Sequence, residues 1–125
     1  MNDIKQVALD FIEAYNAKDF QRMTDLVEED IDFAHYNRGY KLEKWKDLLA
    51  IFPNFSERLS PDRHFAKPTR ITVGDNVVII ESSFCGTAQE DIPNWANAGE
   101  TYDLKLCTIF GFSERGRINE WKDHG

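Results

Sequence analysis

Apolar residues at helical spacing mark the first segment of the chain. They recur every three or four positions and would lie on one face of a helix: Ile4, Val7, Ala8, Phe11, Ile12 and Tyr15. Asp3 followed by Gln6 predicts a capping box at the start of this helix, because the two side chains can satisfy free backbone N–H groups. Asn16 predicts its end.

Two further helices are predicted before the chain turns to strands. Asp19 predicts the cap of a shorter second helix, whose apolar residues extend to Val27. Apolar spacing predicts a third helix over residues 41–52, ended by Pro53. Residues 53–64 are rich in proline and polar residues, which predicts a loop.

Alternating apolar and polar residues predict the strands. A short strand is expected between the second and third helices, at residues 31–37. The remaining strands come after the third helix, at residues 66–73, 77–87, 101–112 and 117–123. Helices followed by mostly antiparallel strands predict an α+β fold, with the three helices packed on one face of the sheet.

Each strand should therefore turn one set of side chains toward the helices. In residues 101–112 the apolar set is Tyr102, Leu104, Leu106, Thr108, Phe110 and Phe112. Glu81 assigns its own set to the outer face, because an unpaired buried carboxylate is costly, and this turns Ser82 and Phe84 inward. In the last strand Trp121 predicts an inward face that Asp123 shares, with Ile118 on the outer side.

The composition is that of one soluble domain over residues 1–125. Nine phenylalanines and an aromatic share of 13% indicate a bulky core or an apolar pocket. A net charge of −7 without clustered lysine or arginine argues against nucleic acid as a partner. No apolar run approaches the roughly 20 residues of a membrane span. Cys85 and Cys107 predict free thiols in a cytoplasmic protein.

Asp123 and His35 are the candidate chemical groups. Enclosed by aromatic residues, the Asp123 carboxylate would have a raised pKa and serve as a general acid or base; otherwise it is a solvated terminal carboxylate. His35 shares a strand face with Phe33, so it points inward either as a pocket residue or as a buried structural histidine. A bulge would put Tyr36 there instead. His64 and His124 are weaker candidates.

Three segments, "FIEAYNAKDFQRM", "EEDIDF" and "GRINEWKDHG", resemble the SnoaL-like branch of the nuclear transport factor 2-like superfamily. The resemblance covers nearly the whole chain. It implies a cone in which a curved, mostly antiparallel sheet wraps around the helices and encloses an apolar pocket. It also implies a homodimer through the outer sheet face. Relatives include polyketide cyclases, limonene epoxide hydrolases and ketosteroid isomerase.

In the cyclases and epoxide hydrolases an acidic residue of the last strand acts as acid or base, and Asp123 matches that position. The Arg and Asp pair that activates water in the epoxide hydrolases aligns with Ser82 and Phe84, so the resemblance disfavours epoxide hydrolysis. The expected substrate-binding residues, beside the candidate acid–base pair Asp123 and His35, are Tyr36, Ser82, Phe84, Trp95, Tyr102, Leu104, Leu106, Phe110 and Trp121.

Two functions remain open. One is an isomerase, cyclase or dehydratase that binds a small apolar or aromatic molecule and moves protons. The other is a non-catalytic ligand-binding or dimeric interaction module of the same fold. No HxH or HxxxH spacing and no Gly-rich phosphate loop occurs, so neither a metal nor another cofactor is expected.

Overall fold

The computed structural model describes residues 3–36, 39–93 and 95–125. Helix α1 (Ile4–Asn16) and helix α2 (Phe20–Leu26) begin at the predicted caps. The Asp3 carboxylate accepts from the Gln6 N–H at 3.2 Å, and Asp19 accepts from the Arg22 N–H at 3.1 Å. Only half of the capping box forms, because the Gln6 side chain donates to Asp10 instead. Val27, expected on the second helix, begins strand β1 (Val27–His35).

The predicted third helix is wrong at both ends. Its first residues form strand β2 (Tyr40–Lys44), which pairs with β1, and helix α3 covers only Trp45–Pro53. Pro53 removes one backbone donor but does not end the helical path, because the next residues continue as a π-helical turn, Asn54–Leu59. Most of the expected loop is therefore helical.

The strands of the described residues form one seven-stranded sheet, in the order β2-β1-β7-β6-β5-β3, with β4 paired to β5. The pairs are antiparallel except β1 with β7, which is parallel. Of the predicted strand 66–73 only residues 70–73 form a strand, and a separate two-residue strand at 64–65 comes just before the predicted range. Of the predicted strand 31–37, residue 37 lies outside the described residues. The remaining bounds are β3 (His64–Phe65), β4 (Arg70–Val73), β5 (Val77–Thr87), β6 (Thr101–Phe112) and β7 (Ile118–His124).

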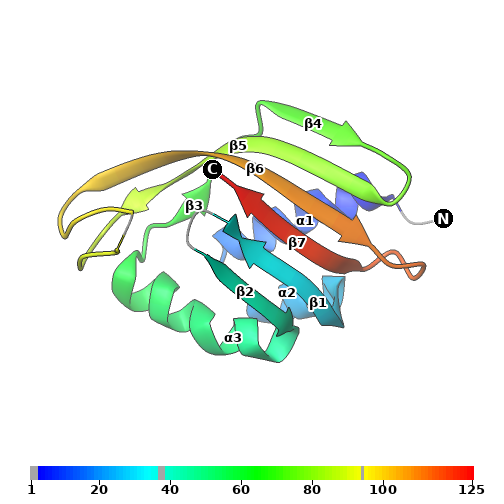
Figure 1. The fold of residues 1–125 in the computed structure, drawn as a ribbon, viewed down its shortest axis with the longest axis horizontal. Coiled ribbons are helices and arrows are strands. Elements are labelled where there is room, and N and C mark those ends of the chain that lie inside the picture. The colour runs from blue at the N-terminus through cyan, green and yellow to red at the C-terminus, as the bar shows by residue number, and fades with distance from the viewer. Residues whose placement is uncertain (1–2, 37–38, 94) are drawn as a thin grey trace.

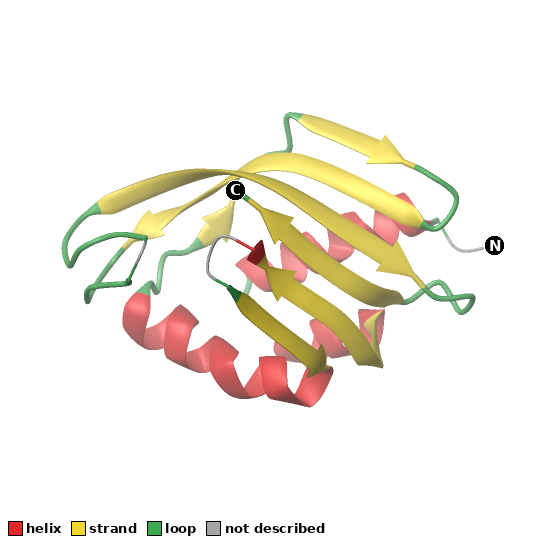
Figure 2. Ribbon diagram, viewed as in Figure 1, coloured by secondary structure: helices red, strands yellow, loops and turns green. Residues whose placement is uncertain are grey.

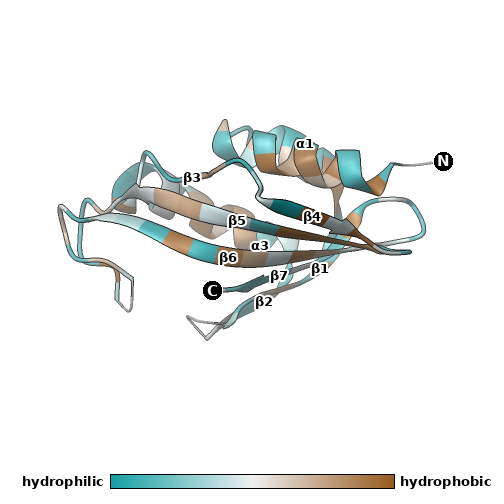
Figure 3. Ribbon diagram, turned by 90° about the horizontal axis from the view of Figure 1, so that it is seen from above, coloured by the Kyte–Doolittle hydropathy of each residue, from teal (hydrophilic) through white to brown (hydrophobic). Residues whose placement is uncertain are grey.

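The sheet curves around the helices, as Figures 1 and 2 show. Seen from above, α1 lies along one face of the sheet and the opposite face carries no helix (Figure 3). The alternating burial of β5 and β6 agrees with the predicted inner and outer sets, with Asp103 and Lys105 exposed on the outer side. This is the expected α+β cone. None of the helices in the described segments has the length and apolar character of a membrane span.

Strand β7 contains a bulge that corrects one prediction. Phe112 pairs with Ile118 but Gly111 pairs with Glu120, so Asn119 is an extra residue in β7. Ile118 consequently turns into the core, where it is fully buried, and does not belong to the outer face. Trp121 and Asp123 lie beyond the bulge and face inward as predicted, since both are almost completely buried.

Aromatic side chains join α1 to the sheet. Phe11 is completely buried and makes edge contacts with Trp121 at a centroid distance of 5.2 Å and with Phe110 at 5.5 Å. It also contacts Trp45 of α3 at 6.1 Å. Phe11 therefore holds the first helix, the third helix and the central strands in one core.

Replacing Phe11 by alanine should destabilise the fold by about 3–5 kcal/mol, because it removes a buried ring and leaves a cavity among three aromatic residues. Urea denaturation measures the change in the free energy of unfolding. Val73→Ala is the control, since Val73 is 48% exposed and its truncation should change that free energy by no more than about 0.5 kcal/mol. A loss below about 1 kcal/mol for Phe11→Ala would contradict this view of the core.

Candidate functional site

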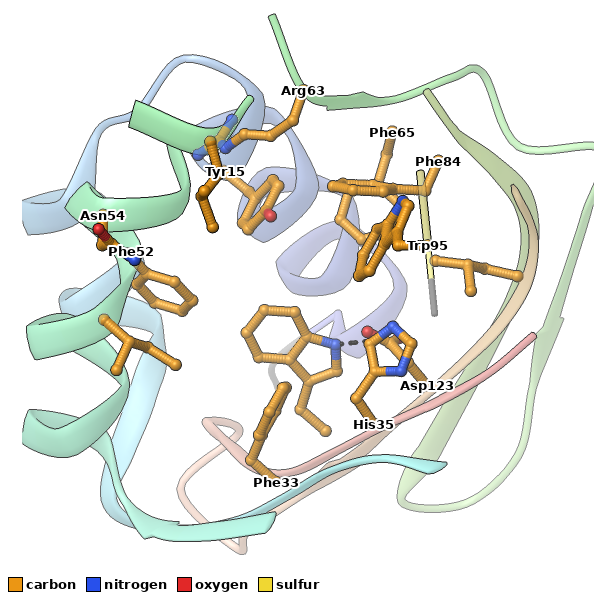
Figure 4. A pocket seen from close by; sticks show the side chains of 14 residues that line it. Tyr15, Phe33, His35, Phe52, Asn54, Arg63, Phe65, Phe84, Trp95 and Asp123 are labelled. Atoms are coloured by element: carbon orange, nitrogen blue, oxygen red, sulfur yellow. Dashed lines mark hydrogen bonds between the residues drawn. The ribbon is translucent and has the colours of Figure 1, made fainter. Parts of the chain in front are cut away.

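A cavity of about 320 Å³ lies between the sheet and α3. This volume is at the lower end of the range for small-molecule sites. Most of the lining is aromatic or aliphatic, with a few polar groups (Figure 4). The lining residues are Tyr15, Phe33, His35, Ile51, Phe52, Asn54, Leu59, Arg63, Phe65, Phe84, Trp95, Leu106, Trp121 and Asp123.

The parallel pairing of β1 with β7 brings the two candidate acid–base groups together. His35 is the cross-strand partner of Asp123 in that register, and both side chains line the cavity. The His35 ring also lies 5.6 Å from the Trp95 ring, measured between centroids. Residues 88 positions apart in the chain thus lie side by side, as Figure 4 shows.

The Asp123 carboxylate is 4% exposed and accepts two hydrogen bonds. The Thr108 hydroxyl, directly opposite on β6, donates to Asp123 Oδ1 at 2.7 Å, and Trp121 Nε1 donates to the same oxygen at 3.2 Å. Both of these donors bind Oδ1, and neither binds Oδ2. Asp123 is therefore a held, inward-facing carboxylate and not a solvated terminal one.

Burial controls the titration of this carboxyl. Loss of hydration raises the pKa of Asp123 from its ordinary 3.8 to about 6, although the hydrogen bonds from Thr108 and Trp121 lower it. Desolvation is the larger effect. A carboxyl with a pKa near 6 exchanges its proton readily near neutral pH, as a general acid or base must.

Of the nine residues expected to bind substrate, four line the cavity: Phe84, Trp95, Leu106 and Trp121. The structure does not bring the other five to its wall. Tyr36 is 50% exposed and packs on the His124 ring, outside the cavity. Tyr102 is hydrogen-bonded to Ser60, and Phe110 is buried in the core against Phe11. Ser82 and Leu104 also lie apart from the lining.

The two weaker histidine candidates lie on the surface. His64 and His124 are both exposed, and a ring nitrogen of His64 contacts the Asp62 carbonyl at 3.0 Å. Across the described parts of the chain, no three His, Cys, Asp or Glu side chains come together as metal ligands would.

Sequence reasoning missed three polar residues of the cavity, Tyr15, Asn54 and Arg63, and the main donor to Asp123, Thr108. Tyr15 belongs to the apolar face predicted for the first helix, where a phenol among apolar residues is the available signal. Thr108 was a polar residue on an apolar strand face, which is a similar signal. Arg63 lies in a segment without periodicity, so no pattern pointed to it.

The model of the SnoaL-like domain family matches residues 8–121. The chain belongs to the SnoaL-like family. None of the curated proteins matches it in sequence. The match includes helix α1 from Ala8 onward, strand β1 and Trp121, and it stops two residues before Asp123.

Solved structures share the SnoaL-like fold at low sequence identity. A candidate polyketide cyclase from Pseudomonas putida is 20% identical, with 100% of this chain and 92% of that chain covered at a TM-score of 0.82. One from Xanthomonas campestris is 18% identical, with 98% and 89% covered and a TM-score of 0.82. A nuclear transport factor 2-like protein of unknown function from Burkholderia pseudomallei is 18% identical, with 99% and 91% covered at 0.78. Identities this low establish the fold alone.

The raised pKa of Asp123 predicts a pH-dependent loss of stability. The native state binds this proton more tightly than the unfolded state, so the group favours folding at low pH. That contribution is fully present below about pH 4 and is lost as the pH rises through about 6. Asp123→Asn cannot ionise, so its free energy of unfolding relative to the parent should rise by roughly 2 kcal/mol between pH 4 and pH 7. Urea denaturation at both pH values measures this, with Asp103→Asn on the outer face as the control. If the free energies of unfolding of parent and Asp123→Asn differ by the same amount at both pH values, the raised pKa is contradicted.

Proposed function

We propose that this protein is an acid–base enzyme that moves a proton on a small apolar or aromatic molecule, in a reaction of the isomerase, cyclase or dehydratase type. The observation that carries the proposal is the buried Asp123 carboxylate, held through Oδ1 at the wall of an aromatic cavity. The family and the candidate polyketide cyclases among the structural relatives support the same class of chemistry.

The proposed step is proton abstraction beside a carbonyl. Ionised Asp123 takes the proton of an acidic C–H bond onto Oδ2, and the electron pair of that bond moves into an enolate. The enolate carbon then recovers a proton from Asp123. His35, beside Asp123, is the group that would hold the substrate oxygen. The mostly apolar wall lowers the local dielectric constant, which strengthens these interactions.

The role of Asp123 can be tested by hydrogen exchange in D₂O, since a hydrogen that Asp123 abstracts is replaced by deuterium when the carboxyl exchanges with solvent before the enolate carbon is reprotonated. The probe is 2-tetralone, an aromatic ketone with acidic hydrogens, followed by ¹H NMR. The parent should accelerate exchange over buffer alone, with a rate that rises through about pH 6 as Asp123 ionises. Asp123→Asn should lower the catalysed rate by about 10²–10⁴-fold, because it removes the base.

Two variants sharpen this experiment. Thr108→Val removes a donor to the Asp123 carboxylate, so the midpoint of the pH profile should move upward by about 1 unit. Asp103→Asn alters an exposed carboxylate on the outer face and should leave the rate unchanged. An exchange rate that survives Asp123→Asn rejects the acid–base proposal and favours the non-catalytic binding module.

We also propose that the protein forms a homodimer through the outer face of the sheet. Ile79 and Ile109 are cross-strand partners there, and Cys107 lies next to them opposite Glu81. Ion pairs border this apolar strip, such as Arg70 with Glu81 at 3.3 Å. A partly apolar sheet face without a covering helix is typical of an interface between copies. A cytoplasmic location, expected from Cys85 and Cys107, stays a prediction.

Ile109→Lys should convert this dimer to a monomer, because it places a charge in the middle of the apolar strip. Light scattering at micromolar concentration measures the mass of the parent and of the variant. Lys46→Glu on the exposed side of α3 is the control and should keep the dimer mass. A monomer mass for the parent would reject the dimer.

A further inference from the structure

A buried arginine forms part of the cavity wall, away from Asp123. Arg63 is 2% exposed, and its guanidinium carbon lies 4.0 Å from the centroid of the Tyr15 ring. Figure 4 shows Arg63 and Tyr15 on one side of the cavity, with Asp123 and His35 on another. The cavity thus has two polar regions in a mostly aromatic wall, and the Tyr15 phenol interacts electrostatically with both Arg63 and Asp123.

The described residues do not satisfy the hydrogen bonding of Arg63, although its guanidinium packs over the Tyr15 ring. Its terminal nitrogens Nη1 and Nη2 are buried and have no hydrogen-bond partner within the described residues. The neighbouring carboxylate of Asp62 is used elsewhere, since it accepts from Thr87 N–H at 2.8 Å and from the Thr87 hydroxyl at 2.9 Å. Buried guanidinium nitrogens without hydrogen bonds are costly, so their presence in a folded protein calls for an explanation, and a bound ligand is one that the cavity beside Arg63 supplies.

The backbone around Arg63 is held firmly in position. The Arg63 N–H donates to the Ser60 carbonyl at 3.1 Å, which closes a turn. The Ser60 hydroxyl is bonded to the Tyr102 hydroxyl at 2.6 Å and to the Thr87 carbonyl at 3.1 Å. This turn is therefore fastened to β5 and β6, and the arginine that it presents is preorganised for binding.

The shape and charge of the group indicate what it binds. A guanidinium offers parallel N–H donors that match the two oxygens of a carboxylate. Arg63 is the one lysine or arginine among the described cavity-lining residues, so a single negative charge matches it better than a phosphate dianion. Burial raises the pKa of the Tyr15 phenol far above its ordinary range, so this hydroxyl keeps its proton and can donate as well.

We propose that Arg63 anchors a carboxylate of the substrate, which makes the substrate a small aromatic or apolar carboxylic acid. The carboxylate lies at Arg63 and Tyr15, and the aromatic body fills the cavity toward Asp123. This assignment rests on the proposed function for the reacting end of the molecule. The net charge of −7 and the Asp123 carboxyl disfavour an anion elsewhere in the cavity, so Arg63 also sets the direction in which the substrate binds.

The test compares two probes of the same size, 2-naphthoate and its neutral carboxamide, by isothermal titration calorimetry. The parent should bind the carboxylate about 10- to 100-fold more tightly than the amide, as charge-assisted hydrogen bonds to a buried guanidinium predict. Arg63→Met keeps much of the side-chain volume and should abolish this preference. Arg63→Lys keeps the charge without the fork and should retain part of it.

Arg58→Met is the matched control. Arg58 is in the same segment of the chain but is more than half exposed and lies 3.6 Å from Glu90, so its loss should leave the preference intact. Circular dichroism and thermal melting verify that each variant is folded. If Arg63→Met fails to fold, the affinities of the parent and of Arg63→Lys for the two probes still test the proposal.

Equal affinity of the parent for acid and amide would overturn the proposal, and so would a preference that persists in folded Arg63→Met. This result is independent of proton transfer. Asp123→Asn should keep the carboxylate preference while losing exchange on 2-tetralone. If the protein prefers the carboxylate but catalyses no exchange, the acid–base proposal is rejected and the carboxylate site at Arg63 is retained. If it catalyses exchange without preferring the carboxylate, only the carboxylate site is rejected.

Discussion

Strand β7 joins the two halves of the sheet, because it pairs in parallel with β1 on one side and antiparallel with β6 on the other. The first strand and the last are thereby neighbours, and the cavity lies beneath their junction. Trp121 packs there against Phe11 of the first helix, while Asp123 comes next to His35. The core and the candidate site thus depend on the same pairing of β1 with β7, so a loss of this pairing would unfold both together.

Asp123 shows how the core accommodates a charge that does not favour folding. Two donors lower its pKa, yet loss of hydration raises the pKa further, and the ionised group remains a net cost to the native state at neutral pH. An apolar residue would cost less at this position. Groups that are retained against stability in this way are concentrated at functional sites.

Most of the correct predictions came from the pattern of apolar and polar residues within a single strand or helix. The alternation in residues 101–112 is regular enough to assign its inner face, and Trp121 was sufficient to turn Asp123 inward. Long-range pairing explains a prediction that failed: Leu42 fits the helical spacing of the residues after it, but pairing with β1 makes residues 40–44 a strand. The position of Arg63 in the cavity wall depends on contacts with residues far away in the chain, such as Tyr15, and no local sequence pattern encodes such contacts.

The bulge at Asn119 has a consequence for how this protein can change over evolutionary time. Ile118 and Trp121 are three residues apart, and a regular strand would turn them to opposite faces. The extra residue lets both enter the core, and it also determines that Asp123 faces the cavity. Substitutions at exposed Asn119 leave this arrangement intact, whereas a single insertion or deletion between Ile118 and Trp121 would turn either the core residue or the carboxylate outward. Over evolutionary time this segment can therefore accept a change of residue type at Asn119 but not a change in its length.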